Sequence, residues 1–118
     1  MKGYNAEDKR RSERIRGGLK ATILGRHIQS HIPVIDISCH GALLAAARYM
    51  NVGETIDITL HLPFTHCSIK IKGRIARTAP NYTKYSNYSY SVALEFSSLL
   101  HSQREVLLTA IHDLKLAN

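Results

Sequence analysis

The chain has 118 residues, a hydrophobic fraction of 44% and a charged fraction of 21%, which fits one globular domain of ordinary composition. No stretch approaches the roughly 20 apolar residues that a membrane-spanning helix needs, and the N-terminus leads into charged residues instead of an apolar signal segment, so we expect a cytoplasmic protein without membrane insertion. The net charge of +7 and the pI near 9.7 indicate an anionic partner, with nucleic acid or a nucleotide as the leading candidates.

Basic residues are concentrated at the N-terminus. Eight of the sixteen lie within the first 26 positions, namely Lys2, Lys9, Arg10, Arg11, Arg14, Arg16, Lys20 and Arg26. Residues 1–17 are polar and basic and show no sustained apolar period, which predicts a flexible arm that ends at Gly17-Gly18. Residues 18–118 are then expected to form the folded domain.

Six segments after the arm have the character of short β-strands. The clearest is the fourth, in which Ile56, Ile58 and Leu60 alternate with polar residues. The predicted strands are Leu19–Gly25, Pro33–Ser38, Ala42–Ala46, Ile56–Leu62, Ile69–Ile75 and Tyr88–Phe96. Six antiparallel strands within about 80 residues, with turn residues between them, predict a mainly β fold and a small closed or nearly closed barrel. Gly73 is expected to mark a bend or bulge.

The apolar period becomes helical from Ser102 onward. One face is apolar and consists of Val106, Leu107, Ala110, Ile111 and Leu114. The spacing of Ser102 and Glu105 is that of a capping box. We therefore expect a C-terminal amphipathic helix that covers the core at one mouth or side of the barrel.

The arm ends in the run Arg10-Arg11-Ser12-Glu13-Arg14, which contains an Arg-x-x-x-Arg pair. By itself this pair is a weak signal, because roughly half of shuffled chains with this arginine content would contain one. A charged run is also most often a solvated surface.

The run Asp36-Ile37-Ser38-Cys39-His40-Gly41 contains an Asp-x-Ser-x-x-Gly motif. This spacing is rarer, with roughly one shuffled chain in fifty expected to contain it. Its ordinary explanation is a hairpin turn, since Asp and Ser side chains bond to the backbone of turns and Gly permits positive φ. Taken alone, the motif fits a turn and a binding site equally well.

The two motifs together, in this order around a six-stranded barrel, resemble the PilZ domain family. The resemblance extends from about Lys9 to Leu116 and includes the strand segments 73–77 and 92–96 and the terminal helix. Ala93 is a minor departure, since many members have Gly there. The resemblance implies a β-barrel of the split-barrel type that binds cyclic di-GMP, with five ligand-binding residues: Arg10, Arg14, Asp36, Ser38 and Gly41.

The residue types suit this ligand, which carries two phosphates and two guanines. The planar fork of arginine bonds to phosphate or to guanine O6 and N7, and its face stacks on a base. Asp36 and Ser38 lie two apart on a predicted strand and should share its outer face, while Ile35 and Ile37 face the core. Gly41 lets the backbone turn and a base approach closely. The arm is expected to become ordered over the ligand.

Three further residues are secondary candidates. Lys9 and Arg11 could add phosphate contacts, and a basic residue such as Lys9 directly before the arginine pair favours a stacked ligand dimer over one molecule. Arg77 is either near the base-binding face or a solvated residue at a strand end. These assignments are weaker than the five motif residues.

Enzyme and metal functions fit the sequence poorly. The seven histidines are scattered, no Cys-x-x-Cys pair is present, and no nucleophile with a matched base or phosphate loop is evident. Cys39 and Cys67 allow one disulfide, but nothing else suggests secretion, so reduced thiols are expected. We expect no catalytic residues, no metal and no cofactor apart from the ligand.

A cyclic di-GMP receptor with one domain requires a separate downstream protein, which the sequence does not identify. One alternative is a small basic barrel that binds RNA or single-stranded DNA, although no row of exposed aromatic residues offers a stacking platform. Another is a PilZ-like interaction subunit that no longer binds nucleotide. The presence of all five motif residues argues against the latter.

Overall fold

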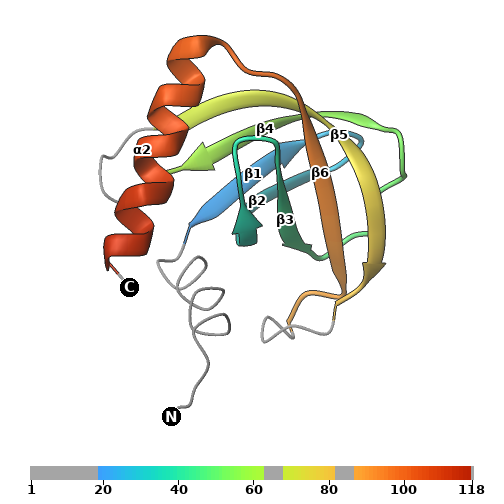
Figure 1. Cartoon of the computed structure of the whole chain (residues 1–118). Coiled ribbons are helices and arrows are strands. Elements are labelled where there is room, and N and C mark those ends of the chain that lie inside the picture. Colours follow the sequence, from blue (N-terminus) through green and yellow to red (C-terminus); the bar gives the residue numbers. More distant parts are fainter. Residues whose placement is uncertain (1–18, 63–67, 82–86, 118) are drawn as a thin grey trace.

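The computed structural model describes residues 19–62, 68–81 and 87–117, with the side chains of the C-terminal helix described to residue 113 (Figure 1). These ranges contain the elements β1 (Lys20–Leu24), β2 (Ile28–Ile37), β3 (Gly41–Ala46), β4 (Thr55–His61), β5 (Ser68–Pro80), β6 (Tyr90–Ser98) and α2 (His101–Ala117). The predicted arm, with Lys9, Arg10, Arg11 and Arg14, lies outside the described residues, as does Cys67.

The strands form a closed antiparallel barrel in the order β1-β2-β3-β6-β5-β4. Closure pairs β1 with β4, and the 13-residue strand β5 pairs with β4 through its first half and with β6 through its second half. This confirms the predicted six-stranded barrel. Because the pairing is antiparallel, the start of β1, the end of β2, the start of β3 and the end of β4 meet at one end of the barrel.

The core is built from the alternating aliphatic residues that the sequence displays. Ile56, Ile58 and Leu60 of β4 are buried, whereas Lys70 and Lys72 between the inward residues of β5 are exposed. Such an inside–outside alternation fixes the register, since a slip by one residue would bring lysines into the core.

Gly73 lies at a register shift between β5 and β6, which confirms the predicted bulge. A Cβ at this position would lie 2.9 Å from Ile58 Cδ1 and 3.0 Å from the Glu95 carbonyl oxygen. The absence of a side chain therefore allows β5 to pack closely on the core and on β6 at the bulge.

β2 begins at Ile28, five residues earlier than predicted, and ends at Ile37. Its first half lacks alternation because Gln29 is a buried polar residue whose Oε1 accepts hydrogen bonds from Ala47 N (3.0 Å) and Arg48 N (3.3 Å). His31 adds a second irregularity, with a φ of 53° beside the register shift between β1 and β2. The strand is maintained by pairing with β1 and not by a pattern of its own.

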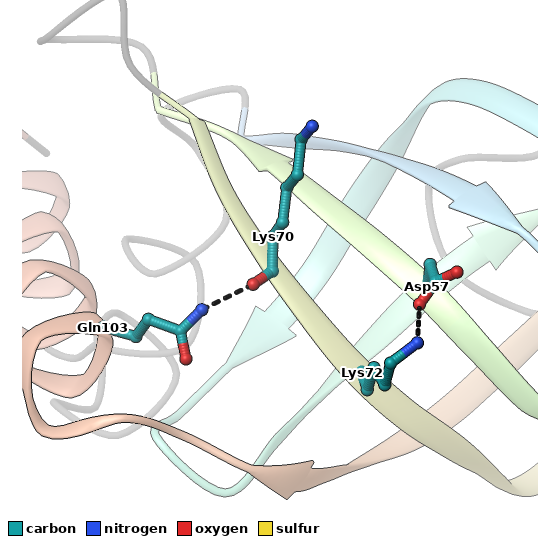
Figure 2. A network of polar contacts seen from close by, with 4 residues as sticks. All are labelled: Asp57, Lys70, Lys72 and Gln103. Atoms are coloured by element: carbon teal, nitrogen blue, oxygen red, sulfur yellow. Dashed lines mark hydrogen bonds and ion pairs between the residues drawn. The ribbon is translucent and has the colours of Figure 1, made fainter.

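Helix α2 lies across the end of the barrel where β1 begins and β4 ends (Figure 1). It begins at His101, and Gln103 secures this start, since Gln103 Oε1 accepts from Leu100 N (3.0 Å). The predicted capping box at Ser102 and Glu105 is wrong, because Leu100 precedes the first turn and Gln103 stands three residues later. Gln103 Nε2 also donates to the Lys70 carbonyl (2.6 Å), which ties the helix to β5 (Figure 2). No helix among the described residues is long and apolar enough to span a membrane.

The predicted apolar face of α2 is correct in its centre only. Leu107 and Ala110 belong to the core, and Ile111 packs against it. Val106 does not, since 46% of it is exposed. The side chain of Leu114 lies outside the described residues. The helix therefore covers the core with a narrower stripe than the sequence predicts and leaves an apolar residue at its edge.

A pair of histidines on the outer wall is expected to make stability depend on pH. The rings of His31 and His61 stack with centroids 4.4 Å apart, and His61 Nε2 lies 2.8 Å from Thr22 Oγ1. Burial, and to a smaller extent the nearby His31, lower the pKa of His61 below its usual 6.5. The neutral ring is thus favoured in the folded state, so the related stability is complete above pH 6.5 and is lost as the pH falls through the lowered pKa.

We therefore expect the free energy of unfolding to fall between about pH 7.5 and about pH 5.5, and the substitution His61→Gln to reduce this fall. Urea unfolding of both proteins at the two pH values measures the difference. An equal pH dependence in the variant would show that the pair contributes nothing to it.

Candidate functional site

The Asp-x-Ser-x-x-Gly motif forms the connection between β2 and β3. Ser38 N donates to the Gly41 carbonyl (2.9 Å), and Ser38 Oγ accepts from His40 N (3.1 Å). Asp36 Oδ1 accepts from Ile37 N at 2.9 Å. The motif residues therefore build the turn, as their ordinary explanation predicts. The motif keeps hydrogen-bonding capacity for a ligand, because the Ser38 hydroxyl still has a proton to donate and the side chain is exposed.

The placement of the motif differs from the prediction in one respect. β2 ends at Ile37, so Asp36 is a strand residue whereas Ser38 already belongs to the turn. Ile35 and Ile37 are both buried, as expected, but a register shift between Val34 and Asp36 also directs Val34 into the core. Asp36 is left half-buried on the outer side of the barrel.

Gly41 is required by the barrel itself. A Cβ at this position would lie 2.1 Å from the Leu94 carbonyl oxygen and 3.2 Å from the Leu94 carbonyl carbon of β6. These are backbone atoms that cannot rotate away. Gly41 does not have positive φ, unlike Gly53. The motif glycine therefore permits the close approach of two strands, and not a left-handed turn.

A row of residues crosses the outer wall from the motif. Asp36 of β2 pairs with Leu43 of β3, Leu43 with Ala93 of β6, and Ala93 with Arg77 of β5. Directly opposed residues of an antiparallel pair project to the same side of the sheet. Leu44 and Leu94, the sequence neighbours of the two middle residues, are buried in the core, so the row faces outward.

The row has a carboxylate at one side and a guanidinium at the other. It spans three strand spacings, or about 14 Å. Leu43 and Ala93 form a low, half-buried platform between Asp36 and the exposed Arg77. This register places Arg77 on the same face as the motif and adds Leu43 and Ala93 to the candidate site. The sequence alone does not indicate these two residues, because only the pairing of four strands brings them together.

The arm joins the barrel beside this site. Val34 N donates to the carbonyl of Leu19, the first described residue, at 3.0 Å, and Asp36 follows two residues after Val34. An extended chain covers at most about 3.4 Å per residue, so Arg14 can reach about 17 Å from Leu19 and Arg10 about 30 Å. Both arginines are therefore within reach of the motif turn and of the platform.

The motif turn also contacts two other elements. The His40 carbonyl accepts from Phe96 N of β6 (2.9 Å), and Cys39 Sγ lies 3.7 Å from Arg104 Nη1 of α2. Cys39 is a free cysteine. A displacement of this turn would therefore alter its contact with the C-terminal helix.

Other charges near the row are partly neutralised. Arg74 Nη2 forms an ion pair with Glu95 Oε1 at 2.7 Å. Glu95 is paired with Gly41 of β3 on one side and with Arg74 of β5 on the other. Within the described part of the chain, no group of three or more His, Cys, Asp and Glu residues is arranged to hold a metal ion. The exposed Ser38 hydroxyl and the exposed Arg77 guanidinium offer hydrogen bonds that suit a polar anionic ligand.

The closed barrel and the candidate site on its outer wall can be compared with known proteins. The PilZ domain model matches residues 8–113, and the chain therefore belongs to the PilZ domain family. This is a family of cyclic di-GMP-binding domains, which typically act as receptors or adaptors and not as enzymes.

Among solved structures, the barrel is similar to the Bacillus subtilis inhibitor of motility MotI/DgrA. The TM-score is 0.69 at 17% sequence identity, over 85% of this chain and 47% of the other. The chain thus spans about half the length of that protein, and the likeness concerns the fold. No curated protein matches the sequence.

Proposed function

We propose that this protein is a cyclic di-GMP receptor of bacterial second-messenger signalling. The nucleotide would bind to the outer wall through Asp36, Ser38 and Gly41 of the motif turn and through Arg10 and Arg14 of the arm. The observation that carries this proposal is the attachment of the arm at Leu19, next to the strand that bears Asp36.

The residues divide the recognition of the ligand between them. Arg10 and Arg14 supply bidentate bonds to phosphate or to the guanine O6 and N7 atoms. The carboxylate of Asp36 and the hydroxyl of Ser38 accept guanine N–H groups or orient an arginine. Leu43 and Ala93 provide a flat apolar floor. Arg77 lies at the far side of this floor, where its guanidinium meets a second phosphate or base.

Binding would change the surface of the protein in two ways. The arm becomes ordered over the ligand, and a shift of the motif turn is transmitted to α2 through the contact of Cys39 with Arg104. The altered surface is then recognised by a downstream protein partner.

Calorimetric titration with cyclic di-GMP tests the proposal. We expect a dissociation constant in the low micromolar range or below, equivalent to about 8 kcal/mol. Equal affinity for a generic single-stranded oligonucleotide would instead favour the alternative of a nucleic-acid-binding barrel. Absence of binding to both would favour an interaction subunit without nucleotide.

Asp36 offers a graded test of the motif turn. We expect Asp36→Ala to weaken nucleotide binding by about tenfold, which corresponds to about 1.4 kcal/mol, because a charge-assisted acceptor is lost. Asp36→Asn keeps one oxygen that can accept from Ile37 N and should preserve the turn. Thermal melting of both variants separates an effect on the ligand from an effect on the fold. Unchanged affinity in a folded Asp36→Ala protein would remove this residue from the site.

A further inference from the structure

Helix α2 and the residue after β4 enclose an apolar groove whose lining residues are not part of the proposed nucleotide site. The groove has a volume of about 230 Å³ and is lined by Leu62, Glu105, Val106, Thr109, Ala110 and Asp113. Its floor is formed by Leu62 and Ala110, which are buried, and by Val106, which is 46% exposed. This volume is sufficient for one aliphatic side chain, and the exposure of Val106 shows that the groove is not filled by the described residues.

Two carboxylates flank the apolar floor. Glu105 and Asp113 stand two turns apart on the same side of α2 and belong to the lining of the groove. His101 approaches Glu105 only to 3.9 Å. The groove thus suits a segment with an apolar side chain between two positive charges.

The arm contains such a segment and is attached next to the groove. Ile15 is the one branched aliphatic residue among residues 1–18, and it stands between Arg14 and Arg16. The pairing of Lys20 with His61 places Leu62, the β4 side of the groove, close to the point where the arm joins β1. Ile15 precedes Leu19 by four residues and can therefore reach about 14 Å from it.

We propose that, in the absence of nucleotide, the arm docks in this groove, with Ile15 against Val106 and Ala110 and with Arg14 and Arg16 facing Glu105 and Asp113. The occupant is thus a segment of the same chain. Its length and its point of attachment make the contact intramolecular, which gives the arm a high effective concentration at the groove.

The consequence rests on the proposed function. Arg14 would have two alternative sites, the acidic margin of the groove and the nucleotide on the outer wall, and cannot occupy both. Docking therefore competes with nucleotide binding and lowers the apparent affinity by the fraction of molecules whose arm is free. Cyclic di-GMP would then release the groove of α2 at the same time as it orders the arm elsewhere.

Docking can be tested without nucleotide by amide NMR spectra of the full chain. We expect Ile15→Ser to shift the amide resonances of Val106, Thr109 and Ala110, whereas Ile15→Val, which keeps an aliphatic side chain, leaves them close to wild type. Val106→Ser should produce the corresponding shifts in residues 14–16. Unchanged resonances in α2 upon Ile15→Ser would overturn the proposal, and shifts that depend on protein concentration would assign the groove to a second copy of the chain.

The competition is tested by calorimetric titration of the same variants with cyclic di-GMP. We expect Ile15→Ser to tighten binding by about threefold or more, because the free fraction of the arm rises, and Ile15→Val to leave it unchanged. Equal affinity of wild type and Ile15→Ser would refute the competition. If neither protein binds the nucleotide while the α2 resonances still respond to Ile15→Ser, the proposed function fails and the docking stands.

Discussion

Replacement of Arg10 or Arg14 by alanine is expected to reduce the affinity for cyclic di-GMP at least tenfold, and replacement of both to abolish measurable binding. Each substitution removes a guanidinium together with its charge-assisted hydrogen bonds to the nucleotide, which contribute about 1.5–3 kcal/mol each. Loss of both groups therefore removes a large part of the expected binding free energy of about 8 kcal/mol. Calorimetric titration of both single variants and of the double variant measures the effect.

Lys2→Ala is the matched control for these arginine variants, since it also removes one positive charge from the arm but lies outside the motif. Its affinity should remain close to wild type at moderate salt, because distant charges are screened. If Lys2→Ala and Arg10→Ala weaken binding to the same degree, the arm acts through its overall charge and not through a specific contact. Retention of binding in the double arginine variant would contradict the proposed site.

The second large effect concerns stability. Gly41→Ala should reduce the free energy of unfolding by about 3 kcal/mol, because overpacking at a site that cannot relax costs this much. The new Cβ would meet the backbone of Leu94 at 2.1 Å, and no side-chain rotation removes this clash. For a domain of this size, the melting temperature should fall by more than about 10 °C.

Gly53→Ala is a useful control for this glycine substitution. Gly53 has a φ of 93°, but a Cβ there meets no atom within 4 Å. The substitution therefore carries only the cost of the left-handed backbone, about 1 kcal/mol, and should lower the melting temperature less. If Gly41→Ala melts at the wild-type temperature, the close contact of β3 with β6 is not as tight as the structure has it. If it melts much lower, the motif glycine serves the fold whether or not it also serves the ligand.

The barrel was predictable wherever one face of a strand is buried and the other is solvated. β4 and the first half of β5 show this, since isoleucines alternate with aspartate, threonine and lysine over the whole length. The bulge at Gly73 was also predictable, because a glycine within a regular strand has few other uses. A closed or nearly closed barrel followed from the number and spacing of the strands, whereas their order around the barrel was not predicted.

The irregular parts were not predictable from a pattern. The first half of β2 depends on the buried Gln29 and on His31 in a left-handed conformation, neither of which produces alternation. The start of α2 depends on Gln103, although Ser102 has the better capping propensity. In both places a tertiary contact outweighs the local preference of the sequence.

The candidate site also contains residues that the sequence predicts and residues that it does not. Asp36, Ser38 and Gly41 lie within six consecutive residues, so their motif was visible in the sequence. Leu43, Ala93 and Arg77 come from three strands and join Asp36 only through the register of the barrel. The contact between Cys39 and Arg104 spans 65 residues and had no sequence signal at all.

The convergence of the arm and the motif turn on one nucleotide is tested most directly by amide NMR spectra recorded during a titration with cyclic di-GMP. We expect the largest shifts in residues 10–14, in the turn from Asp36 to Gly41, and at Leu43, Arg77 and Ala93. Shifts that omit residues 10–14, or that concentrate on the opposite wall around Thr59, Lys70 and Lys72, would contradict it.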